Sequence, residues 1–201
     1  MLLTKKKRQT YLKELGYYKG KIDGKIGPKT KAAYLQLQKD YFTRDEDIDG
    51  KYGKNTDILL RSVYNCKDAK YFKLEEFKCK CKGKYCTGYP AELSKDLITY
   101  LDATRKHYGK ATTIISGLRC KKHNDAQEGS SKTSRHLKGK AADIQISTIS
   151  NTLKGRKGIV DHWIETYPNA NYSYCTGYGR KKKKTTYPTH KMGKSVHCDV
   201  K

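Results

Sequence analysis

The sequence predicts two domains of different class: a small all-α domain of three helices, followed by an α+β domain with a small antiparallel sheet. Three observations carry this prediction. The 201 residues exceed the roughly 150 that are typical of one domain. A turn motif occurs twice within the first third of the chain. Beyond it, β-branched runs and helical periodicities are mixed without the regular alternation of a parallel sheet.

The composition is strongly basic, with 44 Lys and Arg against 20 Asp and Glu and a formal net charge of +24. Such a charge attracts polyanions, and both nucleic acid and an anionic bacterial wall fit this description. The 17 tyrosines supply apolar surface that disordered chains lack. No stretch approaches the roughly 18 consecutive apolar residues of a membrane span. The composition therefore excludes a transporter and a disordered acidic chain.

The N-terminal segment 1–8 is basic and has no apolar stretch of the kind found in secretory signals. We therefore expect synthesis in a cytoplasm, where thiols stay reduced. The seven cysteines are an odd number, which also argues against a complete disulfide framework.

The repeated motif is Ile-Asp-Gly-Lys-x-Gly-x-x-Thr, at residues 22–30 and again 26 positions later at 48–56. Asp-Gly favours a tight turn, and Pro28 favours a helix start directly after the first turn. We expect one helix after each turn and one helix before the first. Their inward residues are Tyr11, Leu12 and Leu15; Ala33, Tyr34, Leu37 and Tyr41; and Leu59, Leu60 and Val63 within a helix from about Thr56 to Tyr64.

A linker near residues 65–70 precedes the predicted α+β domain. Pro90 predicts the start of a helix with Leu93, Leu97, Tyr100, Leu101 and Thr104 on one face. The β-branched run 112–115 predicts a buried strand, and residues 144–146 predict another. A helix over residues 159–167 and a closing strand over 196–200 complete the predicted elements.

The stretch 134–143 carries the candidate chemistry. His136 is separated from Asp143, which opens a strand, by a turn containing Gly139 and two alanines, and such a turn can bring imidazole and carboxylate together. A zinc site with an open position needs about three N, O or S ligands, and His197 is the third candidate. His197 and Asp199 share one face of their strand, about 6.6 Å apart, which suits a ligand and a general base. The alternative is a purely structural role, in which the histidines form ordinary hydrogen bonds and the aspartate caps the end of a strand.

The first third of the chain also resembles a known family. Residues 4–65, with both Asp-Gly turns and the run Leu-Gly-Tyr-Tyr-Lys-Gly at 15–20, resemble the peptidoglycan-binding domain of bacterial and phage wall hydrolases. The resemblance implies a non-catalytic domain over residues 1–66 whose partner is bacterial peptidoglycan. Tyr17, Tyr18 and Tyr52 are candidates for stacking on sugars, and equally for the core.

The motif Ser-x-His-x-x-Gly-x-Ala-x-Asp at 134–143 resembles the zinc motif of the D-alanyl-D-alanine metallopeptidases, whose relatives include phage L-alanyl-D-glutamate endopeptidases. The segment 116–124 and the closing strand 196–200 are similar to two further motifs of that family. The resemblance implies a zinc peptidase domain over residues 67–201, with one catalytic zinc ion. It implies these site residues: His136, Asp143 and His197 as zinc ligands, Arg119 as catalytic and substrate-binding residue, and Ser134 as substrate-binding residue.

The resemblance leaves the catalytic base open. Some relatives carry an acidic residue three positions before the last histidine, where this chain has Lys194. Relatives that end in His-x-Asp leave Asp199 as the candidate base, and His190 is a weaker alternative.

Together the two resemblances imply an endolysin-type cell-wall hydrolase that is made in the host cytoplasm and acts at the bacterial wall. Its reaction is the zinc-dependent hydrolysis of a stem-peptide or cross-link bond, as a D-Ala-D-Ala carboxypeptidase or endopeptidase or an L-Ala-D-Glu endopeptidase. The alternative is an inactive peptidoglycan-binding protein on the same fold, which the residue Lys194 favours. Binding to nucleic acid would explain neither the repeat nor the histidines, so we expect no nucleic-acid partner. Since the sequence has no long apolar stretch, we also expect no membrane insertion.

Four further cysteines form a possible structural metal site: Cys79, Cys81, Cys86 and Cys120. Four thiolates suffice for a structural zinc ion, although the Cys-x-Cys spacing is irregular for such sites. The alternative is a group of reduced, partly buried thiols.

Overall fold

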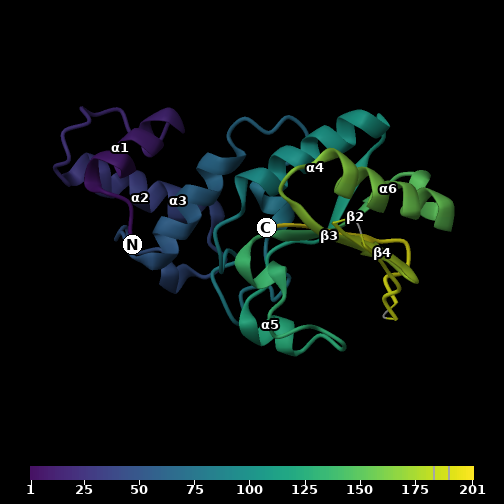
Figure 1. The fold of residues 1–201 in the computed structure, drawn as a ribbon. Coiled ribbons are helices and arrows are strands. Elements are labelled where there is room, and N and C mark those ends of the chain that lie inside the picture. Colours follow the sequence, from purple (N-terminus) through teal and green to yellow (C-terminus); the bar gives the residue numbers. More distant parts are fainter. Residues whose placement is uncertain (183, 190) are drawn as a thin grey trace.

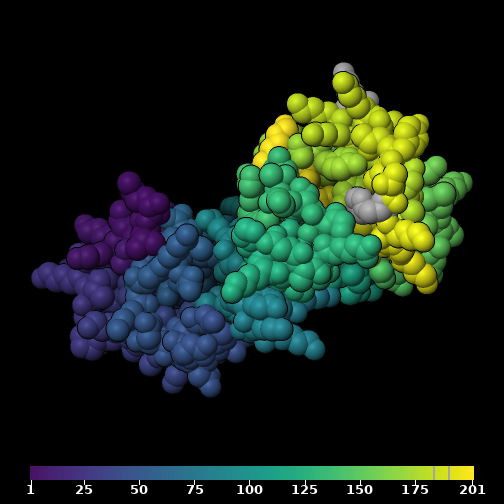
Figure 2. Space-filling model, turned by 90° about the horizontal axis from the view of Figure 1, so that it is seen from below, coloured from purple at the N-terminus to yellow at the C-terminus, as the bar shows by residue number. Residues whose placement is uncertain are grey.

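The computed structural model describes residues 1–182, 184–189 and 191–201. A helical N-terminal region is followed by a region built on a six-stranded antiparallel sheet (Figure 1). The fold class predicted from the sequence is therefore confirmed. Figure 2 shows the N-terminal region, in purple and blue, as a lobe beside the larger green and yellow part. Among the described residues, no helix combines the length and the apolar character needed to cross a membrane.

Three helices form the N-terminal region, as expected: α1 (Lys5–Glu14), α2 (Pro28–Tyr41) and α3 (Lys54–Cys66). The side chain of Thr4 caps α1 by accepting a hydrogen bond from the Lys7 backbone N–H, and Pro28 stands in the first turn of α2. Leu12, Leu37 and Leu59 are fully buried between the helices. The apolar periodicity of the sequence thus identifies the core of this region.

Each turn of the repeat is held by a buried glutamine from the preceding helix, Gln9 for the first turn and Gln38 for the second. In both turns the glutamine Oε1 accepts a hydrogen bond from the glycine N–H at 2.7 Å. The glutamine Nε2 donates to the aspartate Oδ1 and to the carbonyl of the following lysine. Gly24 and Gly50 have φ of +80° and +67°, which favours glycine. The two copies of the motif therefore form the same turn, and in each a glutamine of the preceding helix holds the turn by hydrogen bonds.

The three tyrosines considered for sugar stacking are all engaged within the N-terminal region. Tyr18 is buried, and its hydroxyl donates to the carbonyl of Lys21. The Tyr17 hydroxyl donates to Asp40. The Tyr52 hydroxyl donates to Asp57, and the guanidinium of Arg8 lies 3.9 Å from its ring centre. The core interpretation therefore holds for Tyr18, and the other two hydroxyls are occupied by acidic side chains.

The sheet has the order β1-β2-β6-β3-β4-β5, with antiparallel neighbours throughout. Its strands are β1 (Thr112–Ser116), β2 (Ala141–Ile146), β3 (Ala170–Cys175), β4 (Tyr178–Lys181), β5 (Lys184–Thr186) and β6 (Val196–Val200). The last strand of the chain thus lies inside the sheet, between β2 and β3. The expectation of a buried strand at 112–115 is wrong in part, because β1 is an edge strand that exposes Thr113.

Helices α4 (Lys95–Tyr108) and α6 (Leu153–Thr166) pack against the sheet and meet through Tyr100 and Trp163 (Figure 1). The predicted start at Pro90 is wrong, because α4 begins at Lys95, and the preceding residues are extended. Helix α6 begins six residues before the predicted start. The short elements are α5 (Lys121–Asp125) and four 3-10 helices, η1 (Asp45–Asp47), η2 (Leu74–Phe77), η3 (Arg135–Lys138) and η4 (Ile149–Asn151).

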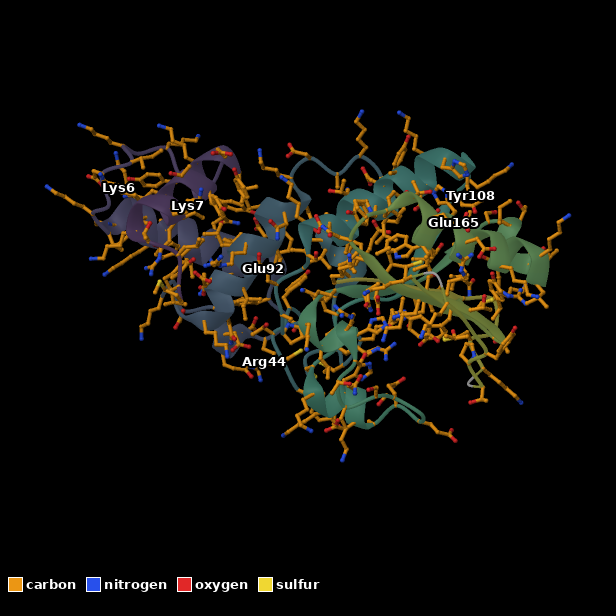
Figure 3. The ribbon with its side chains drawn as sticks, viewed as in Figure 1. Lys6, Lys7, Arg44, Glu92, Tyr108 and Glu165 are labelled. Carbon is orange, nitrogen blue, oxygen red and sulfur yellow. The ribbon has the colours of Figure 1, made fainter. Side chains whose placement is uncertain are left out.

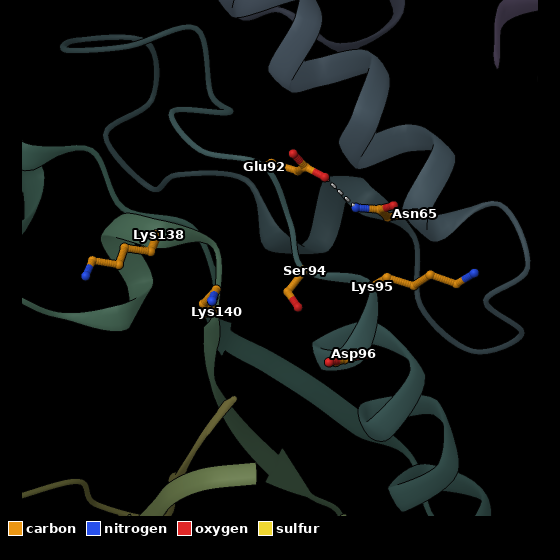
Figure 4. Close-up of a pocket in the computed structure, with 7 residues that line it drawn as sticks. All are labelled: Asn65, Glu92, Ser94, Lys95, Asp96, Lys138 and Lys140. Atoms are coloured by element: carbon orange, nitrogen blue, oxygen red, sulfur yellow. Dashed lines mark hydrogen bonds between the residues drawn. The ribbon is translucent and has the colours of Figure 1, made fainter. Parts of the chain in front are cut away.

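Helix α3 contacts the extended segment that precedes α4, and this contact explains the late start of α4. The Leu93 N–H donates to Ser62 Oγ at 2.9 Å. The Asn65 side chain donates to Glu92 Oε1 at 3.1 Å and to the Leu93 carbonyl at 2.8 Å (Figure 4). A cavity of about 420 Å³ lies beside this contact. In Figure 3, Glu92 and Arg44 lie where the N-terminal helices meet the rest of the chain, whereas Lys6 and Lys7 lie far from the sheet.

Candidate metal centre

The strand register brings two of the predicted ligands together. Asp143 on β2 is paired with His197 on β6, and Asp143 Oδ1 lies 2.9 Å from His197 Nδ1. His136 lies on η3, and Gly139, with φ of +67°, turns the chain from η3 towards β2. This turn places His136 Nε2 3.3 Å from the same oxygen of Asp143. The three side chains are buried, and one ligand atom from each lies within 4.8 Å of the others.

The proton positions on His136 follow from its partners. Its Nδ1 lies 2.7 Å from the carbonyl oxygen of Gly117. A carbonyl only accepts hydrogen bonds, so Nδ1 carries the proton of the neutral ring and Nε2 presents a lone pair to Asp143 Oδ1. Two lone pairs that face each other in a buried site are stabilised by a cation between them. The donor set of two imidazoles and one carboxylate is that of a catalytic zinc site with an open position, and these residues fit it.

The electrostatics of the three groups are set by burial and by their mutual contacts. Burial lowers the pKa of His136 and outweighs the opposing effect of Asp143. Burial opposes ionisation of Asp143, but the neighbouring imidazoles of His136 and His197 outweigh it and hold the pKa of Asp143 well below its usual range. Burial also disfavours the cationic form of His197, yet hydrogen bonds to Asp143 and Asp199 raise its pKa to about 9. The site therefore combines the neutral imidazole of His136, the carboxylate anion of Asp143 and an imidazole at His197 whose cationic form the two neighbouring carboxylates stabilise.

Arg119 lies beside the candidate ligands and fixes the orientation of Asp143. Its Nη2 donates to Asp143 Oδ2 at 2.8 Å, and its Nε donates to Ser116 Oγ at 3.0 Å. The backbone N–H of Arg119 donates to the His136 carbonyl at 3.2 Å. These bonds leave Asp143 Oδ1 facing the histidines. Arg119, predicted from the sequence to bind substrate, thus also lies against a predicted metal ligand.

Asp199 lies behind His197, on the side opposite to the converging ligand atoms. Its Oδ1 accepts hydrogen bonds from Tyr172 N–H at 2.7 Å and from Asn171 Nδ2 at 3.0 Å. Its Oδ2 lies 3.5 Å from His197 Nε2 and 3.6 Å from Arg135 Nε. A carboxylate that receives the outer N–H of a ligating histidine fixes its tautomer and orientation. This geometry favours a positioning role for Asp199, and its assignment as the base stays a prediction.

A groove of about 900 Å³ opens over the candidate metal centre. Ser134 lines it, as do Arg119 and the basic side chains of Arg135 and Lys191, which the sequence analysis did not single out. Tyr174 also lines the groove and stacks on the His197 ring at 4.6 Å between centroids. The alternating pattern of residues 170–175 was the available signal for a strand at this position.

Positions 194 and 190, which the sequence suggests as possible sites of the catalytic base, provide no additional carboxylate. Lys194, at the position where some relatives carry an acid, is exposed. His190 lies outside the residues that the structure describes. The acidic side chains that line the groove within the described part of the chain are Glu128, Asp143 and Asp199.

Comparison with protein families gives two matches in the predicted order. Residues 6–56 match the model of a peptidoglycan binding domain, and residues 70–157 match the model of Peptidase M15. The second match includes Arg119, His136 and Asp143 and ends before His197. No curated protein matches the chain.

Proposed function

We propose that this chain, in which a peptidoglycan-binding domain precedes a Peptidase M15 domain, is an endolysin-type hydrolase that cuts a peptide bond of peptidoglycan with a zinc ion as cofactor. The observation that carries the proposal is the convergence of His136 Nε2, Asp143 Oδ1 and His197 Nδ1 at the groove. In this proposal the first domain binds the polymer, and the M15 domain carries out the peptidase chemistry. The proposed boundary between the two lies at residues 66 and 67.

The three converging side chains are the proposed zinc ligands. A bound zinc ion polarises a scissile carbonyl and lowers the pKa of water. The remaining chemistry falls to the chain itself. The Gly117 carbonyl holds the proton of His136 on Nδ1, so that Nε2 is available as a ligand. Arg119 holds Oδ2 of Asp143, so that Oδ1 is available in the same way.

Asp199 is proposed to act through His197. By accepting the Nε2 proton, its Oδ2 holds the imidazole with Nδ1 towards Asp143. The role predicted from the sequence, removal of a proton from the attacking water, requires a carboxylate within about 3.2 Å of that water. Both oxygens of Asp199 face other partners, which supports the positioning role.

Substrate recognition is proposed to use the basic side of the groove. Stem peptides carry carboxylates, and Arg135 and Lys191 bring positive charge to the groove, with Ser134 as a hydroxyl contact. Arginine binds carboxylates through charge-assisted hydrogen bonds. The candidate bonds are the terminal D-Ala-D-Ala bond, the cross-link bond and the L-Ala-D-Glu bond.

A second candidate function is a wall-binding protein without turnover. The observation that favours it is the exposed lysine at position 194, together with the engagement of both buried carboxylates near the site. This alternative predicts that the chain binds peptidoglycan and zinc but releases no peptide.

Digestion of purified peptidoglycan, followed by mass spectrometry of the released fragments, separates the two functions. The proposal expects fragments that a chelator abolishes and added zinc restores, and the masses identify the bond. The Asp143→Asn variant is the matched control, because it removes one charge from the site and leaves the N-terminal domain intact. It should still sediment with peptidoglycan. A zinc-loaded wild type that releases nothing from several wall types would refute the peptidase assignment.

A further inference from the structure

We propose that Cys79, Cys81, Cys86 and Cys120 bind a second, structural zinc ion, separate from the candidate metal centre. One sulfur from each lies within 4.8 Å of the others, and the Sγ atoms of Cys81 and Cys86 are 3.5 Å apart. Sulfurs about 2.3 Å from a zinc ion at the centre of a regular tetrahedron are about 3.8 Å from one another. The cluster therefore already has the dimensions of a tetrathiolate site.

The loop that carries three of these cysteines reaches the main hydrophobic core at Tyr89 and Leu93, beyond the last of the three. Residues 78–94, all of which the structure describes, form neither helix nor strand. Cys79, Cys81 and Cys120 are buried, yet they form a small cluster with Cys86 that is separate from the main hydrophobic core. Between Cys81 and Cys86 the chain reverses through two residues with positive φ, at 82 and 83. The part of the loop between Cys79 and Cys86 thus has only the cysteine cluster as its core, which is typical of small metal-stabilised modules.

The contacts of the sulfur atoms and the nearby charge suit an anionic metal cluster. The Cys120 N–H donates to Cys79 Sγ at 3.4 Å. Four thiolates around Zn²⁺ leave a net charge of −2, which needs compensation. Six lysines lie within two positions of these cysteines in the sequence, at positions 78, 80, 82, 84, 121 and 122. The Nζ atoms of Lys84 and Lys122 both lie over the ring of Tyr85, within the same loop.

The position of the cluster links it to the candidate metal centre. Cys120 directly follows Arg119, whose guanidinium holds Asp143. On the other side, Cys79 follows η2, and the Phe77 carbonyl at the end of η2 accepts a hydrogen bond from Leu118 N–H at 2.8 Å. Zinc bound to the four cysteines would thus fasten these two segments together. The segment that leads to Cys120 carries the Gly117 carbonyl and the Arg119 side chain, which orient the proposed catalytic ligands.

Zinc content of the purified full-length chain tests this proposal without any assay of activity. We expect two zinc ions per chain in the wild type and one in the His136→Ala variant, which keeps all seven cysteines. Cobalt loaded into His136→Ala should show intense thiolate-to-cobalt charge-transfer absorption. The Cys79→Ser/Cys120→Ser variant should lose this absorption, and the matched control Cys66→Ser, outside the cluster, should keep it.

If the serine variant fails to fold, zinc release can be measured instead on a variant that keeps all its cysteines. A mercurial thiol reagent added to zinc-loaded His136→Ala should release its zinc ion in parallel with modification of the cluster. The proposal is overturned if His136→Ala purifies and reconstitutes without metal, if iron in place of zinc fills the site, or if peptide mapping finds disulfides among the four cysteines. Failure of peptidase activity alone leaves these readouts unchanged, so the two proposals are tested separately.

Discussion

Replacement of Asp199 by asparagine separates a positioning role from a role as general base. In the wild type, all the groups facing this carboxylate are hydrogen-bond donors: Asn171 Nδ2 and Tyr172 N–H at Oδ1, and His197 Nε2 and Arg135 Nε near Oδ2. An asparagine has one oxygen and one NH₂ group. We expect the oxygen to stay with Asn171 and Tyr172, because these contacts of 3.0 and 2.7 Å are the shorter ones.

The asparagine NH₂ group then faces His197 Nε2. Because two hydrogen-bond donors repel each other, a proton on Nε2 becomes unfavourable. The imidazole shifts to the tautomer that carries its proton on Nδ1, the nitrogen proposed to bind zinc. Loss of such an outer partner lowers metal affinity about 10- to 100-fold, which corresponds to about 1.4 to 2.7 kcal/mol of binding free energy. At saturating zinc, most of the peptidase activity should return.

Zinc affinity is measured by competition with a chromogenic chelator, and kcat is measured on soluble stem peptide at saturating zinc. A base role predicts the opposite pattern, with unchanged zinc affinity and a kcat about 10²- to 10⁴-fold lower. That result would refute the positioning argument. Asp68→Asn is the matched control, since Asp68 is an exposed aspartate that is not among the residues lining the groove. It should change neither quantity.

Three further predictions concern the metal centre and the fold. Asp143→Asn should lose the zinc ion of the candidate metal centre, one of the two expected per chain, and abolish peptide release, as measured by metal analysis and mass spectrometry; retained activity would refute the ligand assignment. Gly139→Ala should lower the midpoint of thermal unfolding strongly, because a Cβ there lies 1.9 Å from the Glu92 carbonyl oxygen at a φ of +67°. Gln38→Leu leaves partly buried groups of the second turn unsatisfied and should cost about 2 to 4 kcal/mol of unfolding free energy, measured by urea unfolding. The control Gln36→Leu, at an exposed position, should change the unfolding free energy little. Equal losses in both variants would contradict the proposed role of Gln38 in holding the second turn.

The elements with long periodic patterns were predictable from the sequence, and those defined by pairing were not. The three N-terminal helices and strands β2 and β6 follow from apolar spacing. Strands β3 and β4 were missed because they are short and contain Asn171 and Gly179, residue types that are depleted in strands, and partners in the sheet stabilise them. The start of α4 was misplaced because Pro90 is a local signal, whereas the contact of Leu93 with Ser62 on α3 is a tertiary one.

The candidate site divides in the same way. Sequence motifs nominated His136, Asp143 and His197, and the structure brings all three together. The groups that orient them were not predictable by the same means. The Gly117 partner of His136 is a backbone carbonyl, which has no sequence signature. Strand parity placed Asp199 on the same face as His197, but parity does not say which imidazole nitrogen faces it.

The repeat shows how a motif can identify a domain without marking its ligand contacts. The aspartates and glycines of both turns are bound by Gln9 and Gln38, which lie outside the repeated motif. Both aspartates are exposed, whereas the two glutamines that hold the turns are buried, so substitution of a glutamine should act on stability first. A variant such as Gln38→Leu should therefore bind peptidoglycan normally at temperatures where the domain stays folded, and lose binding only as the domain unfolds.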